Sequence, residues 1–251
     1  MDSTYRFRVL GRWEAAGPDG MIPVPPGRLR ILLSALLLTS GGPTSVPALT
    51  RQLWPDRAPE RPRGALYTYI TRLRKLLGRD LIRTSFSGGY ELAVPVDVDL
   101  FRFRDLVRRS ATADSAEAEL DLLRSALRLW RGRPFADVDS AWLELEVVPR
   151  LTEEWLAATE RRQDLELAAH RHVGLIPELR ELTAAHPTRE SLWARLITCL
   201  HRAGWRAEAL EAFHQARITL RDELGLDPGT QLREAQRLVL LDTPATGGDH
   251  R

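Results

Sequence analysis

The stretch from residue 60 to residue 77 restricts the fold most, because its two sides differ sharply in character. At about 100° per residue, its apolar side chains gather on one side of a helix. The apolar side carries Leu66, Tyr69, Ile70, Leu73 and Leu77. The opposite side carries Arg61, Gly64, Thr68, Thr71, Arg72 and Lys75, flanked by Tyr67 and Arg74. The pattern predicts a helix that begins near Glu60, ends at Gly78 and leaves a basic face available to a partner.

The residues around this helix predict a small mixed domain. Residues 5–10 alternate apolar and basic side chains with period two, which indicates a strand, and a second short strand is expected around residues 22–24. Apolar residues at helical spacing predict a helix over 28–39. Thr44 and Ser45 offer N-cap oxygens for a second helix that ends at Trp54 and Pro55.

Two short strands are expected after the basic helix. Residues 81–84 and 90–94 read as strands, and the glycine-containing segment 85–89 joins them as a hairpin. The order of strand, three helices and hairpin describes a winged helix-turn-helix, in which the third helix enters the major groove of DNA. The hairpin is the wing of this fold. Tyr90 is expected to pack beneath the wing.

The side chains of the basic face suit contact with DNA. Arginine can donate two hydrogen bonds to guanine, and threonine offers a hydroxyl and a methyl group. We therefore expect Thr68, Thr71, Arg72 and Lys75 to face DNA, together with Arg61 at the start of the helix. In the wing, Arg83, Thr84, Ser85 and Ser87 are expected to contact the sugar-phosphate backbone. The alternative interpretation is an ordinary solvated helix face.

The distribution of charge agrees with this division of the chain. Residues 1–96 hold 14 Lys and Arg against 7 Asp and Glu, whereas residues 97–251 hold 22 against 27. A basic part joined to an acidic part is expected when only one of them meets a polyanion.

The chain after residue 97 has helical periodicity almost throughout. Asp99 is expected to cap its first helix, and the later segments 142–170, 173–185, 189–203, 206–222 and 230–241 continue the pattern. One pair of segments fits a tetratricopeptide unit, with Trp193, Leu196, Gly204, Ala209, Phe213 and Ala216 at the positions of its key residues. Ile197, Leu200 and Arg221 depart from that pattern. Cys199 is expected to lie in the core.

We therefore expect a mainly α protein with a small α+β N-terminal domain. A winged helix-turn-helix would occupy residues 1–96 and a tetratricopeptide-like all-α domain residues 97–243, followed by a flexible tail at 244–251.

Several runs of sequence resemble one known family. The run from Arg63 to Gly78, with Gly88-Gly89-Tyr90, resembles the recognition helix and wing of OmpR-type DNA-binding domains. Runs 98–103, 126–134 and 223–229 complete a resemblance to the small Streptomyces antibiotic regulatory proteins, whose second half is the bacterial transcriptional activation domain.

The resemblance implies an activator of antibiotic biosynthesis genes that binds direct repeats near the promoter −35 element. It also implies contacts with the RNA polymerase holoenzyme, through its sigma factor and core subunits, and a head-to-tail dimer on double-stranded promoter DNA. The family's base- and phosphate-contacting stretch falls on Tyr67, Thr68, Thr71, Arg72, Arg74 and Lys75.

Other classes of function find less support in the sequence. No phosphate-binding G-x-x-x-x-G-K-[ST] run is present, and the histidines lack partners at metal-ligand spacing. We expect no catalytic residue, cofactor or metal. The longest apolar run falls well below the roughly 20 residues of a membrane span, and we expect a cytoplasmic protein. A promoter-blocking repressor and a helical-repeat adaptor without DNA readout remain as alternatives.

Overall fold

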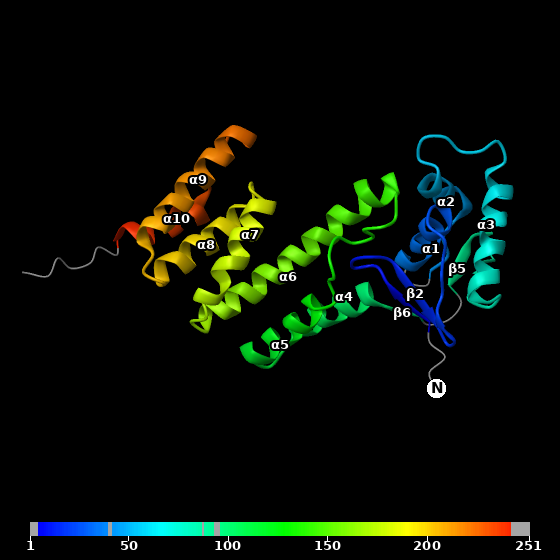
Figure 1. Ribbon diagram of the computed structural model, residues 1–251, viewed down its shortest axis with the longest axis horizontal. Helices are drawn as coiled ribbons and strands as arrows, with labels where there is room; N and C mark the ends of the chain where they lie inside the picture. The colour runs from blue at the N-terminus through cyan, green and yellow to red at the C-terminus, as the bar shows by residue number, and fades with distance from the viewer. Residues whose placement is uncertain (1–4, 40–41, 87, 93–95, 242–251) are drawn as a thin grey trace, which may run out of the picture. The chain divides into compact units, whose positions relative to one another are not determined.

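The computed structural model describes residues 5–39, 42–86, 88–92 and 96–241 (Figure 1). The chain divides into two compact units, Met1–Ala158 and Thr159–Arg251. The division falls within helix α6 (Val148–Ala168). The first unit is therefore longer than the N-terminal domain expected at 1–96, because it also includes the first helices of the second half. The expected tail at 244–251 lies outside the described residues.

A four-stranded sheet forms at the N-terminus of the first unit. Its strands are β1 (Arg6–Arg8), β2 (Glu14–Gly17), β3 (Gly20–Met21) and β6 (Asp97–Val98), in the order β3-β2-β1-β6. Strand β1 pairs antiparallel with β2, where Phe7 faces Ala15, and parallel with β6, where Phe7 faces Val98. The early strand was predicted correctly, although it is shorter than 5–10.

The second strand was misplaced in the sequence analysis. Residues 22–24 are not a strand, and the β2–β3 hairpin precedes them. The reason is that Pro23 has no N–H to donate to a sheet, and Pro25 and Pro26 follow at once. The Ala15 carbonyl accepts the Ile22 N–H at 2.9 Å, and regular pairing stops there.

Three helices follow, as predicted: α1 (Arg28–Leu38), α2 (Val46–Leu53) and α3 (Pro62–Leu77). The Ser45 hydroxyl caps α2 by accepting the Ala48 N–H at 3.3 Å. Helix α3 begins at Pro62, a residue suited to a first turn, and ends before Gly78, whose φ of 95° lies in the region that favours glycine.

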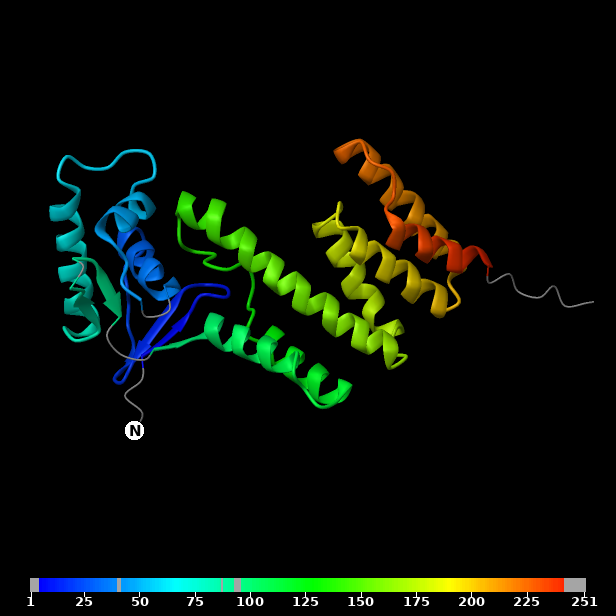
Figure 2. The same ribbon diagram turned by 180° about the vertical axis from the view of Figure 1, so that it is seen from behind.

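The wing is a two-stranded hairpin of β4 (Ile82–Thr84) and β5 (Tyr90–Leu92), with Arg83 opposite Glu91. It is tied to the segment before α2, because Thr44 and Tyr90 exchange backbone hydrogen bonds of 2.8 and 2.9 Å. The view from behind also shows α3 beside this hairpin (Figure 2). Tyr90 is buried, as expected. The fold of these elements is a winged helix-turn-helix.

Two helices of the second half pack in the first unit. They are α4 (Asp99–Ser110) and α5 (Ala116–Leu127), and they are followed by a π-helical turn, Leu143–Val147, that leads into α6. Phe103, Trp130 and Trp155 form an aromatic cluster with ring centroids 5.5 and 5.9 Å apart. Asp99 lies one residue inside α4, after the N-cap residue Val98, and its carboxylate accepts the first-turn N–H of Leu100 at 2.9 Å. The same carboxylate also binds backbone N–H groups of a distant loop, which was not expected.

The second unit contains η2 (Val173–Leu175), α7 (Ile176–Ala185), α8 (Glu190–Arg202), α9 (Arg206–Leu224) and α10 (Thr230–Leu241). Helices α8 and α9 form the expected tetratricopeptide-like pair. Gly204 makes the turn with φ 80°, and Trp193, Ala209, Phe213 and Ala216 are buried. Cys199 is fully buried as expected, and burial raises the pKa of its thiol to about 12.

Candidate nucleic-acid interface

Helix α3 rests on an apolar base that fixes its orientation. Leu66, Ile70 and Leu73 are fully buried, and the helix packs against α1 and α2. The Tyr69 ring lies 6.1 Å from the ring of Trp54, and the Tyr5 hydroxyl donates to the Leu77 carbonyl at 2.5 Å. Because one side is held so closely, the opposite side is presented as a rigid surface.

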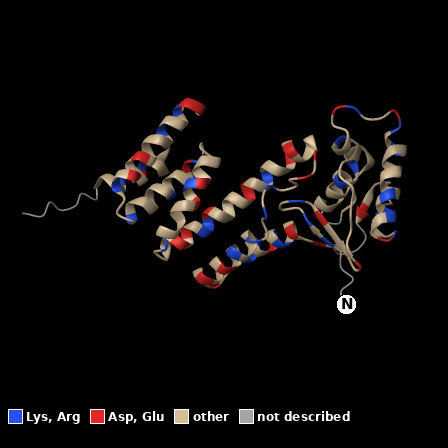
Figure 3. Cartoon of the chain, viewed as in Figure 1, with Lys and Arg blue, Asp and Glu red and all other residues tan. Residues whose placement is uncertain are grey.

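The exposed side of α3 carries the residues expected to meet DNA. Lys and Arg recur along this helix in Figure 3. Tyr67 is 62% exposed. The Thr68 hydroxyl donates to the Gly64 carbonyl at 3.0 Å, so it is left with its acceptor lone pairs and its methyl group. The exposed members of the expected set are Arg61, Tyr67, Thr68, Thr71, Arg72, Lys75, Arg83 and Thr84.

Arg74 and Ser85 are only half-exposed. The Arg74 guanidinium donates to the Ile82 carbonyl at 3.0 Å and to the Thr84 hydroxyl at 3.1 Å. Arg74 therefore joins α3 to the first strand of the wing, a role that no sequence pattern indicates. Ser87 lies outside the described residues.

A cleft beside α3 adds one basic residue to the candidate interface. It measures about 500 Å³ and places Arg28, Arg72 and Lys75 around Pro25, Pro26 and Tyr69. Arg28 also donates to the Leu53 carbonyl at the end of α2. No motif in the proline-rich segment indicates Arg28, which comes near α3 only through the packing of α1.

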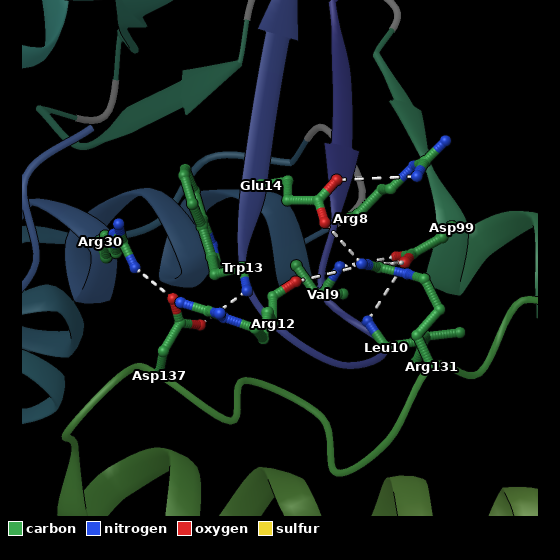
Figure 4. A network of polar contacts seen from close by, with 10 residues as sticks. All are labelled: Arg8, Val9, Leu10, Arg12, Trp13, Glu14, Arg30, Asp99, Arg131 and Asp137. Carbon is green, nitrogen blue, oxygen red and sulfur yellow. Dashed lines mark hydrogen bonds and ion pairs between the residues drawn. The ribbon is translucent and has the colours of Figure 1, made fainter. Parts of the chain in front are cut away.

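A second polar cluster holds the loop between β1 and β2 (Figure 4). The buried Asp99 carboxylate accepts the N–H groups of Val9 at 2.9 Å and Leu10 at 3.1 Å. The Arg131 guanidinium lies 3.4 Å from Asp99 and 2.7 Å from Glu14. Burial raises the pKa of Asp99 above its ordinary value, and it outweighs the opposite effects of these N–H groups and of Arg131.

Asp137 holds the other end of the same loop. Its carboxylate accepts the Trp13 N–H and contacts the Arg30 guanidinium, both at 2.6 Å. Although burial acts to raise the pKa of Asp137, the bonds to Trp13 and Arg30 lower it overall. Since Arg30 belongs to α1, this contact links residues after α5 to the helix on which α3 packs. No local sequence pattern indicates this network, because its members lie up to 124 residues apart.

The described part of the chain holds neither a metal-binding cluster nor a membrane-spanning helix. No three or more His, Cys, Asp or Glu side chains come together there in a way that could hold a metal ion. Every helix in the same residues is too short or too polar to cross a membrane.

Comparison with known proteins gives matches over most of the chain. The family described as the bacterial transcriptional activator domain matches residues 98–240. The regulatory protein DnrI of Streptomyces peucetius is 38% identical over 231 residues, covering 86% of this chain and 84% of that protein. The regulatory protein AfsR of Streptomyces coelicolor is also 38% identical, over 96% of this chain but only 24% of its own length.

One solved structure is similar along nearly the whole chain. It is EmbR of Mycobacterium tuberculosis in complex with a low-affinity phosphopeptide, and it superposes with a TM-score of 0.86 at 31% sequence identity. The match covers 96% of this chain and 66% of the EmbR chain.

Proposed function

The chain belongs to the Streptomyces antibiotic regulatory protein family of transcriptional regulators, and on this basis we propose that it binds promoter DNA sequence-specifically and activates transcription from it. In this proposal α3 lies in the major groove, and the wing contacts the neighbouring backbone. The target genes are those of secondary-metabolite biosynthesis. The protein acts in the cytoplasm, where the chromosome lies.

The observation that carries the proposal is the division of α3 into two faces. Leu66, Ile70 and Leu73 anchor the helix in the core, while Arg72 and Lys75 extend from its exposed side. A rigid helix that presents a guanidinium and an ammonium group suits both base edges and phosphates. Arg74 also ties α3 to strand β4 of the wing. This contact keeps the wing beside the helix, an arrangement that favours DNA binding over an ordinary solvated face.

Activation is proposed for the residues after 97. The match to the bacterial transcriptional activator domain supports a role for these helices in contacting the RNA polymerase holoenzyme. Binding to direct repeats places two copies head to tail on DNA, because a direct repeat relates its half-sites by translation. A repressor that binds the same DNA remains the second candidate, and transcription with purified polymerase on a target promoter separates the two outcomes.

The first test is the double variant Arg72→Ala, Lys75→Ala. Both side chains are exposed, so the fold should persist, whereas affinity for the target promoter should fall by about 2–4 kcal/mol. Fluorescence anisotropy at two salt concentrations should also give a shallower salt dependence, because the variant neutralises fewer phosphates.

The matched control is Arg108→Ala, Arg109→Ala, which removes the same charge from the exposed end of α4. Unchanged affinity in the α3 variant, or equal losses in both variants, would contradict the placement of α3 in the groove. A second measurement uses the fact that Lys75 is the chain's only lysine. Promoter DNA should slow acylation of its side chain, whereas an equal concentration of free nucleotides should not.

A further inference from the structure

A basic cleft opens in the first unit, separate from the α3 surface. It measures about 200 Å³ and is lined by Arg6, Arg8, Arg102, Arg128 and Arg131. Arg6 and Arg8 extend from the same face of β1, because Phe7 between them points into the core and is 1% exposed. The other arginines come from α4 and from the segment after α5, so three distant parts of the sequence build this cleft.

The carboxylates in and around the cleft do not balance these arginines. Asp97 and Asp99 also line it, and Glu14 lies beside it. The Arg8–Glu14 and Arg102–Asp97 ion pairs are long, at 3.6 and 3.7 Å. Within the described residues, Arg6 and Arg128 make no ion pair, and the Arg128 guanidinium donates only to the Ser125 hydroxyl. Guanidinium groups with free donors therefore converge on one small volume.

The Asp99 carboxylate already has several partners of its own. Its carboxylate oxygens already accept the N–H groups of Val9, Leu10 and Leu100. Arg131 also pairs with it, at 3.4 Å. The Asp99 carboxylate is thus engaged by the β1–β2 loop and by Arg131, and within the described residues the other four arginines of the cleft form no ion pair with it.

We propose that this cleft binds a compact phosphoryl anion, such as diphosphate or the phosphate group of a small monoester. Arginine's planar fork matches phosphoryl oxygens in geometry and charge. The cleft is smaller than the roughly 300–1,000 Å³ of sites for drug-sized ligands, which favours a compact anion. A bound phosphoryl group cross-links β1 to α4 and to the segment after α5, and it thereby stabilises the first unit.

Isothermal titration calorimetry of the full chain with sodium diphosphate tests the proposal, with sodium chloride at equal ionic strength as the reference titration. We expect saturable binding at one site. The variant Arg6→Ala, Arg102→Ala should raise the dissociation constant about tenfold or more, since it removes charge-assisted hydrogen bonds. The control Arg108→Ala, Arg109→Ala removes equal charge outside the cleft and should change it by less than about twofold.

A second variant distinguishes a loss of diphosphate binding from a loss of the fold. Arg128→Ala removes a side chain that is bound only to Ser125, and it should weaken diphosphate binding without changing the melting temperature of the free protein. No saturable binding to the wild-type chain, or equal affinity in the cleft and control variants, overturns the proposal.

The same arginines could instead contact DNA phosphates, and anisotropy with promoter DNA separates the two sources. We expect the Arg6→Ala, Arg102→Ala variant to bind DNA within about twofold of wild type. A large loss of DNA affinity, with no diphosphate binding in wild type, would assign the cleft to the DNA backbone and reject the proposal. Promoter binding by the α3 variant is measured independently of diphosphate binding by the cleft variant. The DNA-binding proposal and the cleft proposal can therefore be rejected one without the other.

Discussion

At the scale of single residues, the wing depends on a glycine in a tight backbone contact. A Cβ atom built on Gly89 would lie 2.3 Å from the Thr44 carbonyl oxygen and 2.9 Å from its carbon. These are backbone atoms of the bridge between the wing and the segment before α2, so no flexible side chain can move aside. Only glycine fits this position without displacing the bridge.

We predict that Gly89→Ala lowers the free energy of unfolding by about 1–3 kcal/mol, because overpacking forces the backbone apart. Urea denaturation followed by circular dichroism measures the change. The control Gly64→Ala lies on exposed α3, where the nearest atom to the new Cβ is 4.0 Å away. That control should be neutral or stabilising by up to about 1 kcal/mol. Equal stability of the Gly89→Ala variant and wild type would contradict the role assigned to Gly89.

The Asp99 carboxylate gives a prediction with a definite pH dependence. Asp99→Asn should destabilise the fold by about 1–3 kcal/mol, because the amide NH₂ would face backbone N–H groups that now find an oxygen. Since burial raises the folded-state pKa of Asp99 above the ordinary 3.8, the folded chain takes up this proton at a pH where the unfolded chain is still ionised. Asp99 therefore favours folding increasingly as the pH falls through the raised pKa.

The difference in unfolding free energy between wild type and Asp99→Asn should accordingly widen as the pH falls from neutrality toward the ordinary pKa of an aspartate, since the variant lacks this titration. Urea titrations at neutral pH and at successively lower pH values measure it. A difference that narrows on acidification would show that the carboxylate is stabilised as the anion and that burial is not the dominant effect.

Residues on one helix were easier to predict than residues that act across the chain. The exposed position of Thr68, Thr71, Arg72 and Lys75 follows from helical periodicity, which is a local property. Asp99 was predicted as a helix cap because the local pattern permits it, and only folding places its carboxylate next to Val9 and Leu10. Arg28 was missed for the same reason.

At the scale of elements, α3 and the wing act as one piece because Arg74 bridges them. The sequence identifies Arg74 as a basic residue beside the DNA-facing side, but it does not reveal that the guanidinium is engaged by Ile82 and Thr84.

The boundaries of α3 were predicted within two residues, since proline and glycine mark its ends. Strands β2 and β3 were missed, because Ala15, Ala16 and Gly17 lack an alternating pattern.

We predict that Arg74→Ala lowers the free energy of unfolding by about 1–2 kcal/mol through loss of these hydrogen bonds. It should also speed hydrogen exchange of the wing amides. Arg72→Ala is the matched control, because it removes an exposed arginine from the same helix and should leave stability unchanged within about 0.5 kcal/mol. If both variants exchange at the wild-type rate, the bridge does not restrain the wing.

At the scale of the whole molecule, the N-terminal elements depend on residues that the sequence-based domain boundary at 96 excludes. Asp99, Arg131 and Asp137 together hold the β1–β2 loop. The Phe135 N–H donates to the Val9 carbonyl at 2.9 Å. A composition shift marks where charge changes along a chain, whereas a folding unit is set by which segments satisfy one another's backbone groups.

We predict that a fragment of residues 1–158 folds cooperatively and binds promoter DNA, whereas a fragment of residues 1–96 is several kcal/mol less stable, on the order of 3–5, because the Val9 and Leu10 N–H groups and Arg30 lose their partners. Thermal melting and anisotropy of both fragments measure this. The triple variant Asp99→Ala, Arg131→Ala, Asp137→Ala of the longer fragment should behave like the shorter one. Equal melting temperatures for the two fragments would contradict the dependence.

The pairing of β1 with β6 has a consequence for synthesis on the ribosome. The second edge of β1 is covered only after residues 97 and 98 have left the exit tunnel. The loop that follows β1 is held only after residue 137 has emerged. A nascent chain shorter than this leaves the edge of β1 open to other strands, which is a known route to aggregation. A slowing of translation once residue 137 has left the tunnel would therefore give the DNA-binding elements time to close, whereas a pause before residues 97 and 98 have left it would prolong their exposure.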